Sequence, residues 1–201
     1  MAEAPPPRVP IADLFRGHTR ETIAGTFGVV ACFAVYYLAT AFALGYGTTA
    51  LHYGRQAFLA VQLGAILFMA AGILVAGWLS DKLDARRVLM GGCLAGVLVG
   101  LTLGPLMGSG HIAGVFLFLA LALLVMGFVY GPLGAWLPGL FPARVRYTGA
   151  SMAFNVGGIL GGSLAPMIAQ ALAERGGLPP VGLYFSGACL VSLVALAMVR
   201  K

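Results

Sequence analysis

Charged residues are scarce in this sequence, and their scarcity is the first constraint on its fold. The 12 Lys and Arg and the 6 Asp and Glu amount to 9% of the 201 residues, whereas soluble domains carry about 25%. Hydrophobic residues make up 60%, and the mean hydropathy is +0.97. A water-soluble fold is excluded, because it could not remove this much apolar surface from water. The composition predicts an all-α membrane protein that crosses the bilayer several times.

The side chains that carry most enzyme chemistry are also few. None of the histidines or acidic residues lies in the middle of an apolar run. The cysteines Cys32, Cys93 and Cys189 do lie in apolar runs, without metal-ligand spacing, and we expect them to be reduced and buried. A rhomboid-like protease would pair Ser151 with an intramembrane histidine, which the sequence lacks. We therefore predict no catalytic residue, no metal site and no cofactor.

The excess of basic residues gives a net charge of +6. These residues stand in short clusters at the ends of apolar runs and form neither a patch nor a basic helix. Nucleic-acid binding is therefore not expected, because it requires a continuous basic surface. The partner that the composition predicts is the lipid bilayer.

Charge-free windows define six predicted spans, because a bilayer core about 30 Å thick needs about 20 apolar residues per helix. One window is long enough for two spans and breaks at GPLMGSGH, residues 104–111. The predicted spans are 22–46, 56–80, 87–107, 112–137, 148–172 and 180–199. Residues 1–21 contain four prolines and no apolar core. They are predicted to form a tail that precedes the bundle of residues 22–201.

The basic residues fall mostly on one side of the predicted membrane. Only Arg55 and Arg175 fall on the other side. The first side holds Arg8, Arg16, Arg20, Lys82, Arg86, Arg87, Arg144, Arg146, Arg200 and Lys201. The positive-inside rule therefore predicts that both termini are cytoplasmic. We expect a multi-pass protein of a bacterial-type inner membrane.

The loop between the second and third spans, GWLSDKLDARRVLMGG, concentrates charge of both signs. A topology signal needs only basic residues, so the acidic residues suggest a further role. Asp84 can cap the third span, whereas Asp81 at the end of the second span needs a positive partner. Such a pair would latch helix ends together and break when they separate. The alternative is a solvated turn that carries topology charges.

This loop resembles the signature loop of the major facilitator superfamily, G-x-L-S-D-R-x-G-R-R, which joins the second and third helices of each six-helix half. Asp84 stands where glycine is usual, and Ala85 stands where the first arginine is usual. The resemblance implies a gating role for the matching residues, which are Gly77, Asp81, Lys82, Arg86 and Arg87.

A second stretch narrows the resemblance. YGPL (130–133) and LFPARVRYTGAS (140–151) look like the pattern YGP…LFPTRVRYTGAS of the metabolite:proton symporters, and GGILGGSLAP (157–166) continues it. PIADLFRGHTR (10–20) resembles the segment before the seventh helix of that family. The resemblance covers nearly the whole chain but only the second half of a twelve-helix transporter. It implies half of a major facilitator fold, and each such half consists of two inverted three-helix repeats.

The sequence contains 30 glycines, and small residues let helices approach closely in lipid. Two predicted packing faces consist of Gly91, Gly92, Gly96 and Gly100 on the third span and Gly157, Gly158, Gly161 and Gly162 on the fifth. Pro132 in the fourth span and Pro166 in the fifth predict helix kinks, because each removes a backbone hydrogen bond. By resemblance these kinks suit helices that bend as a cavity opens and closes, while static kinks are the alternative.

Polar side chains at membrane depth are the default candidates for a binding site. The resemblance implies that the first, second, fourth and fifth spans face a central cavity, while the third and sixth face lipid. On the cavity spans we predict four substrate contacts, which are Tyr36, Gln62, Tyr130 and Asn155. The alternatives are interface anchoring for the tyrosines and the joining of two helices for the amides.

The resemblance implies a half-size secondary transporter of organic acids or osmolytes that works by alternating access. Arg144 and Arg146 at the predicted cytoplasmic mouth favour an anionic substrate, and they serve equally well as topology signals. An even number of spans lets a second, parallel copy of the chain complete the pathway as a homodimer. Without an ionisable side chain in mid-membrane, the dimer should be a poor proton symporter. The alternative function is a non-transporting half that acts as an assembly or regulatory partner.

Overall fold

The computed structural model describes residues 14–15 and 17–199, which are almost entirely helical. Within these described residues, six helical units are long and apolar enough to cross a membrane, so the predicted number of spans is confirmed. The units are Thr19–Thr49, Arg55–Leu83, Ala85–Met107, Ile112–Gly139, Arg146–Gly176 and Leu178–Met198. The predicted ranges end within four residues of these bounds. Most of the predicted tail, namely residues 1–13 and 16, lies outside the described residues.

Three of the six units are interrupted along their length. The first comprises α2 (Thr19–Tyr37), the π-helix η1 (Leu38–Phe42) and α3 (Ala43–Thr49). The fourth comprises α6 (Ile112–Tyr130) and α7 (Leu133–Gly139), and the fifth comprises α8 (Arg146–Gly158), the π-helix η2 (Ile159–Ser163) and α9 (Leu164–Gly176). The continuous helices are α4 (Arg55–Leu83), α5 (Ala85–Met107) and α10 (Leu178–Met198).

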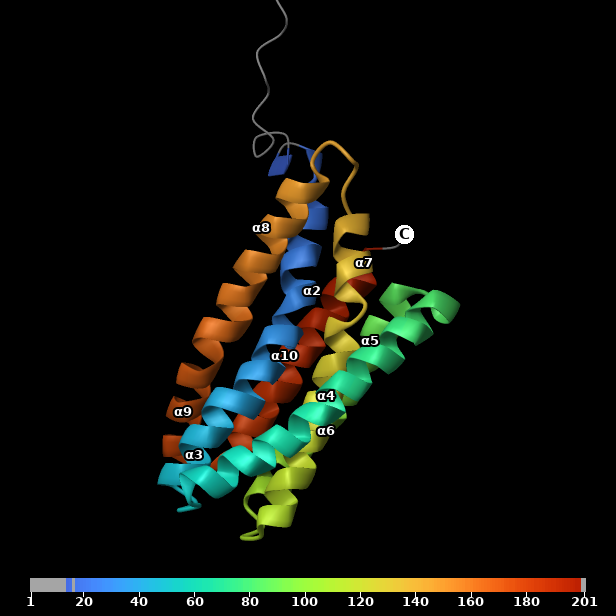
Figure 1. Cartoon of the computed structure of the whole chain (residues 1–201). Helices are drawn as coiled ribbons and strands as arrows, with labels where there is room; N and C mark the ends of the chain where they lie inside the picture. The colour runs from blue at the N-terminus through green and yellow to red at the C-terminus, as the bar shows by residue number, and fades with distance from the viewer. Residues whose placement is uncertain (1–13, 16, 200–201) are drawn as a thin grey trace, which may run out of the picture.

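The helices run side by side between two ends of the bundle (Figure 1). One end, here called the terminal end, holds the start of α2, the α4–α5 turn, the α7–α8 loop and the end of α10. The opposite end holds the α3–α4, α5–α6 and α9–α10 connections. The two termini of the bundle therefore share one end, as an even number of spans requires. That this end faces the cytoplasm stays a prediction.

Glycines set the closest helix contacts. A methyl group on Gly72 of α4 would lie 2.5 Å from the carbonyl oxygen of Leu124, and one on Gly127 of α6 would lie 2.5 Å from that of Met69. The same close approach occurs between α5 and α10 and between α2 and the α8–η2 segment. The glycines that allow it are Gly100, Gly182, Gly157 and Gly161. The helices are thus held by van der Waals packing between backbones, because lipid offers little hydrophobic drive for their association.

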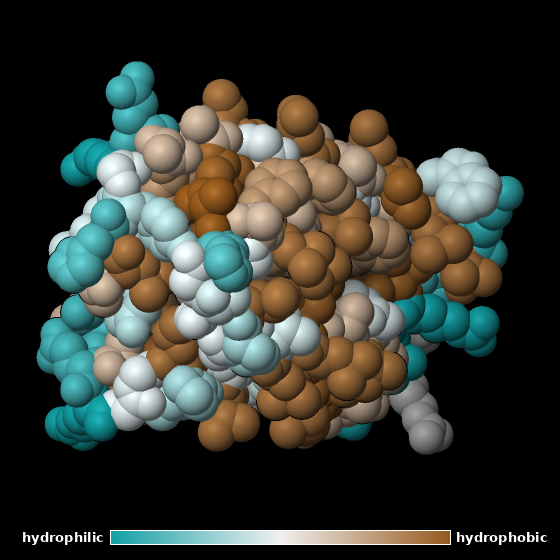
Figure 2. Space-filling model, turned by 90° about the horizontal axis from the view of Figure 1, so that it is seen from below, coloured by the Kyte–Doolittle hydropathy of each residue, from teal (hydrophilic) through white to brown (hydrophobic). Residues whose placement is uncertain are grey.

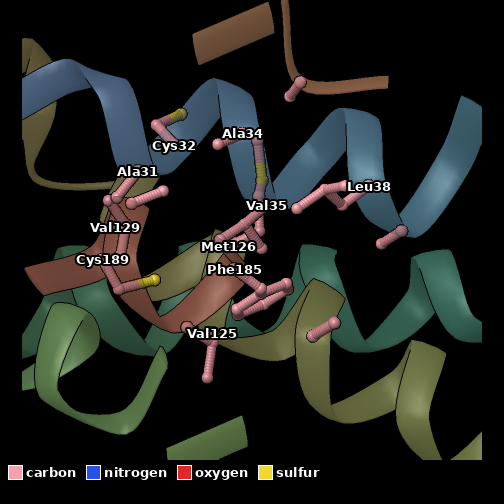
Figure 3. Close-up of a cluster of buried hydrophobic side chains, with 14 of the residues drawn as sticks. Ala31, Cys32, Ala34, Val35, Leu38, Val125, Met126, Val129, Phe185 and Cys189 are labelled. Atoms are coloured by element: carbon pink, nitrogen blue, oxygen red, sulfur yellow. The ribbon is translucent and has the colours of Figure 1, made fainter. Parts of the chain in front are cut away.

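The core lies where α2, α6 and α10 meet (Figure 3). Val35 of α2, Val129 of α6 and Phe185 of α10 are fully buried there. The three cysteines are buried and free, so the prediction of buried, unpaired thiols is confirmed; they are Cys32, Cys93 and Cys189.

Two buried hydroxyl groups join α10 to its neighbours. The Ser192 hydroxyl donates to the carbonyl oxygen of Phe27 at 2.6 Å and accepts a hydrogen bond from the Ala31 amide at 2.8 Å, both in α2. The Ser186 hydroxyl donates to the carbonyl oxygen of Val97 in α5 at 2.8 Å. Each hydroxyl therefore has a backbone partner, which removes the cost of placing it in an apolar core.

Large apolar side chains point outward from the bundle. On α4, Leu63, Leu67 and Leu74 are 69%, 70% and 74% exposed. Figure 2 shows hydrophobic side chains across the middle of the face it presents and hydrophilic ones gathered at its margins. Such a surface fits contact with the hydrocarbon core of a bilayer, because water would penalise this much exposed apolar area.

The helix geometry changes at both predicted prolines. Pro132 lies in the two-residue break between α6 and α7, and Pro166 lies in the first turn of α9, directly after η2. Proline has no amide hydrogen, so the helical ladder cannot continue through it unchanged. The π-helix η1 contains no proline, and its sequence gives no signal that predicts the interruption.

The α4–α5 turn holds Asp84 in a conformation that favours glycine. Its φ is +110°, which residues with a Cβ rarely adopt. Asp84 is the N-cap residue of α5, but its side chain makes no capping hydrogen bond, so the predicted side-chain cap is wrong. Only its carbonyl group takes part, by accepting a hydrogen bond from the Val88 amide at 3.2 Å. The glycine that is usual at this position in the signature loop therefore has a conformational reason.

We expect Asp84→Gly to stabilise the bundle by about 1 kcal/mol, because it removes the strain of a Cβ at positive φ. Thermal unfolding of the purified protein in detergent measures this gain. Asp84→Ala is the matched control, since it removes the same carboxylate but keeps the Cβ, and it should bring no gain. Equal effects of the two substitutions would contradict the strain at this position.

Candidate functional site

One side of the bundle carries three adjoining hollows, which together we call the hollow face. The first has a volume of about 390 Å³ and lies between α6–α7 and α8. The second, of about 360 Å³, lies between α2 and α8–η2, and the third, of about 290 Å³, lies among α2, α4 and α6. The hollows are connected because Tyr130, Phe154, Asn155, Phe33 and Tyr37 each line two of them.

The lining of the hollow face is aromatic and polar but uncharged. Its described residues come from the first, second, fourth and fifth spans, and none of them is charged. The rings of Phe33 and Phe154 meet edge to face with centroids 5.0 Å apart, and those of Tyr36 and Tyr37 do so at 5.4 Å. Hydroxyl groups, one amide and several ring faces thus converge in apolar surroundings. This combination suits a small polar molecule, which needs few but well-placed hydrogen bonds.

Three of the four predicted substrate contacts lie on this face. Tyr36 lines the third hollow, Tyr130 lines the first and third, and Asn155 lines the first and second. Tyr130 is 44% exposed. The Asn155 amide nitrogen donates to the carbonyl oxygen of Ser151 at 2.7 Å, and the amide oxygen can accept a hydrogen bond from another group. Contact with a substrate stays a prediction for these residues.

The fourth predicted contact, Gln62, is not among the residues that line the three hollows. Its buried side chain donates to the carbonyl oxygens of Ala39 at 3.1 Å and Thr40 at 2.9 Å, both in η1. A π-helix shifts the hydrogen-bond register and frees carbonyl groups, which need a partner inside a membrane. The structure thus gives Gln62 the helix-joining contact that the sequence analysis named as its alternative. Its contact with a substrate stays a prediction.

The signature loop makes a contact that sequence reasoning missed. The Arg86 guanidinium donates to the carbonyl oxygens of Leu196 at 2.8 Å and Ala197 at 3.3 Å, and Arg20 donates to that of Met198 at 2.6 Å. Two arginines from other spans therefore bind the unpaired carbonyls at the C-terminus of α10, where the helix dipole favours positive charge. Sequence spacing places these arginines near helix ends but does not say which helix they reach.

The other loop residues face outward. The Lys82 ammonium lies 3.9 Å from the centroid of the Trp78 ring. Asp81 is exposed, and within the described part of the chain no ion pair engages it. Gly77 lies near the end of α4, and a methyl group there would meet no atom within 4 Å. The latch role predicted for this loop stays a prediction, while Arg86 holds α10.

Arg144 and Arg146 lie in and just after the α7–α8 loop at the terminal end, and both are exposed. Arg146 donates from Nε to the carbonyl oxygen of Phe141 at 3.3 Å. Ala150, one turn further along α8, lines the first hollow. The two arginines therefore lie near the terminal end of the hollow face, and their role at a cytoplasmic mouth stays a prediction.

In the described part of the chain, six apolar helices with an uncharged, aromatic and polar hollow face on one side define a membrane protein that crosses the bilayer several times. The profile of the Major Facilitator Superfamily matches residues 21–201, and the chain belongs to this superfamily.

Curated relatives agree with this assignment. The inner membrane metabolite transport protein YhjE of Escherichia coli K12 is 37% identical over an alignment of 199 residues, which covers 96% of this chain and 45% of that protein. The shikimate transporter of the same organism is 29% identical over 82% of this chain and 38% of its own length. The proline/betaine transporter of Salmonella typhimurium is 25% identical over 84% of this chain and 33% of its own length. The chain thus spans less than half the length of these relatives. No solved structure matches it significantly.

We expect Gln62→Leu to destabilise the bundle by about 1–3 kcal/mol, because two carbonyl groups of η1 lose their donor inside the membrane. The matched control is Gln170→Leu, since Gln170 is exposed on α9 and, among the described residues, donates only to Glu174 at 3.0 Å. Unfolding in detergent with increasing dodecyl sulfate measures both. Equal stability of the two variants would show that η1 does not depend on Gln62.

Proposed function

We propose that this chain is a half-size secondary transporter of small polar metabolites that works by alternating access, assembled as a parallel homodimer in an inner membrane with both termini in the cytoplasm. The observation that carries the proposal is the hollow face, where hydroxyl, amide and aromatic groups gather on one side of an otherwise apolar bundle. A binding site at membrane depth is expected where such groups converge.

The exposure of this face supports a second bundle. Tyr130 is 44% and Tyr37 is 38% exposed, and the side chain of Asn155 is also exposed. Polar groups in the middle of a span are unfavourable against lipid, so a covering partner would remove this cost. A second copy presents the same face when the two copies are related by a two-fold axis along the membrane normal. The pathway then runs between two hollow faces.

The size and chemistry of the hollows support a small polar substrate. Volumes of about 290–390 Å³ on each copy suit a metabolite of modest size. Relatives named for shikimate and for proline and betaine indicate the same range of molecules for this chain. Because the lining is uncharged, a preference for anions would come from Arg144 and Arg146 at the terminal end of this face.

The interruptions of the spans support movement around this site. Pro132 separates α6 from α7, and residues of both helices line the first hollow. The π-helix η2 contributes Ile159 and Ser163 to the second hollow, and it ends three residues before Pro166 in the chain. Irregular helix segments of this kind can change geometry without breaking a full ladder of hydrogen bonds, so the site can open to either side in turn.

We expect the purified protein in detergent to have twice the 20.7 kDa mass of one chain by light scattering. Ile159→Trp should shift the equilibrium toward monomer by about tenfold, because Ile159 is 59% exposed and lines the second hollow. The control Leu183→Trp, at a 64% exposed position of α10 outside the hollows, should leave the dimer intact. A purely monomeric protein that binds substrate would overturn the homodimer.

Uptake into proteoliposomes tests transport itself, with shikimate, proline and glycine betaine as the first panel. Asn155→Ala and Tyr130→Phe should each lower kcat/KM about three- to tenfold, the equivalent of one lost hydrogen bond. Tyr147→Phe is the matched control, since Tyr147 is 86% exposed and lies outside the hollows. A pH-sensitive dye inside the vesicles should report no proton entry with substrate. A dimer that carries no member of a wide panel would favour a non-transporting role.

A further inference from the structure

The helices α4, α5 and α6 pack against one another (Figure 1). An apolar groove separate from the hollow face is lined by residues of these three helices. We call it the α5 groove; its volume is about 360 Å³. Among its lining residues are Leu79 and Leu83 of α4, Gly91 of α5 and Phe128 of α6, and it shares none with the three hollows. A function in substrate transport therefore does not account for it.

Gly91 keeps this groove open. A methyl group on Gly91 would meet no atom within 4 Å, whereas one on Gly92 would touch Val129 and Phe128 at 3.1–3.2 Å. Gly96 and Gly100 likewise pack against neighbouring helices. Gly91 is exposed, so it does not take part in the helix packing that was predicted for the glycines of this span. Because Gly91 has no side chain, the α5 groove stays open on the outer surface of the bundle.

A positive charge stands at the terminal end of the groove. Arg87 is its only charged lining residue in the described chain. Arg87 is exposed, and no hydrogen bond or ion pair within the described residues engages it, whereas its neighbour Arg86 is bound to α10. Gly91 and Ala95 follow Arg87 on the same side of α5 at steps of four residues, which places them about 6 and 12 Å deeper in the membrane.

The surrounding charges leave Arg87 available. Lys82 adds a second cation at the end of α4, over the Trp78 ring. Asp81 and Asp84 lie in the same turn and are exposed, and neither forms an ion pair with Arg87 in the described structure. A phosphate group at this level would meet a planar guanidinium that is free to bind it through two nitrogens.

We propose that the α5 groove binds one anionic phospholipid of the leaflet at the terminal end, with an acyl chain in the groove and the phosphate on Arg87. The bilayer supplies acyl chains at this depth, so apolar filling needs no further partner. Arg87 adds the selectivity, since one basic side chain near a charged membrane surface favours anionic lipid by about fivefold.

A second apolar groove on the same bundle shows what the charge adds. It lies between α2 and α10, has a volume of about 410 Å³ and is lined by apolar residues alone, such as Phe27, Val191 and Val194. An acyl chain of any phospholipid would fill it equally well. The α5 groove differs by the arginine in its lining, and the proposal therefore concerns headgroup selection rather than burial of hydrocarbon.

The quenching of Trp78 fluorescence by brominated lipids tests the proposal in reconstituted protein. Trp78 is 57% exposed and is adjacent in the chain to Leu79 of the groove. The Trp78→Phe variant, which keeps the buried Trp136, supplies the background signal to subtract. Brominated phosphatidylglycerol should bind about five- to tenfold more strongly than brominated phosphatidylcholine. Equal quenching by both lipids would overturn the proposal.

Matched variants separate the two parts of the site. Arg87→Gln should bring the preference for phosphatidylglycerol close to one, while Arg175→Gln, with the same charge change at the opposite end, should keep it. Gly91→Leu should reduce quenching by both lipids, because the new side chain fills the groove without a clash. Gly187→Leu, at another glycine with no atom within 4 Å of an added methyl group, should not. An unchanged preference in Arg87→Gln would contradict headgroup selection, and unchanged quenching in Gly91→Leu would contradict the groove. These readouts measure lipid binding alone and do not depend on transport.

Discussion

The constraint on which this structure depends is that lipid offers backbone polar groups no partner. Every carbonyl that a helix leaves unpaired must be satisfied by another part of the chain. Gln62 does this for the π-helix η1, and Arg86 and Arg20 do it for the C-terminus of α10. Because the same lipid provides little drive for helix association, the helices are held by close packing at glycines such as Gly72 and Gly127. Cohesion and polar satisfaction therefore come from a few specific contacts.

The bundle has a hollow face and a surface that can face lipid, and the interrupted helices are those that line most of the hollow face. The three interrupted units, Thr19–Thr49, Ile112–Gly139 and Arg146–Gly176, contribute most of the residues that line the hollow face. The helices α5 and α10 are continuous and contribute none. A continuous helix satisfies its own backbone and can face lipid. An interrupted one needs polar neighbours, and it is found where polar side chains gather.

Two adjacent arginines of the signature loop have different roles, because one contacts another helix of the bundle and the other faces outward. Arg86 is directed into the protein and binds the last carbonyls of α10, whereas Arg87 is directed outward at the end of an apolar groove. Successive residues of a helix point about 100° apart, so neighbours in sequence reach different surfaces. The glycine that is usual in this loop is replaced by Asp84, which holds a positive φ without a capping bond.

The sequence by itself determined the number of spans, their approximate ends and the uneven distribution of basic residues, because span length and charge are set locally by the thickness and polarity of the membrane. It also pointed to Tyr36, Tyr130 and Asn155, since polar groups in long apolar runs are conspicuous. Only the tertiary structure decided that these three share one face while Gln62 supports η1. It alone placed Arg86 on α10 and left Gly91 open. These outcomes depend on how each helix is rotated about its axis and on which helices pack against it. Both are set by contacts between residues that lie far apart in the chain.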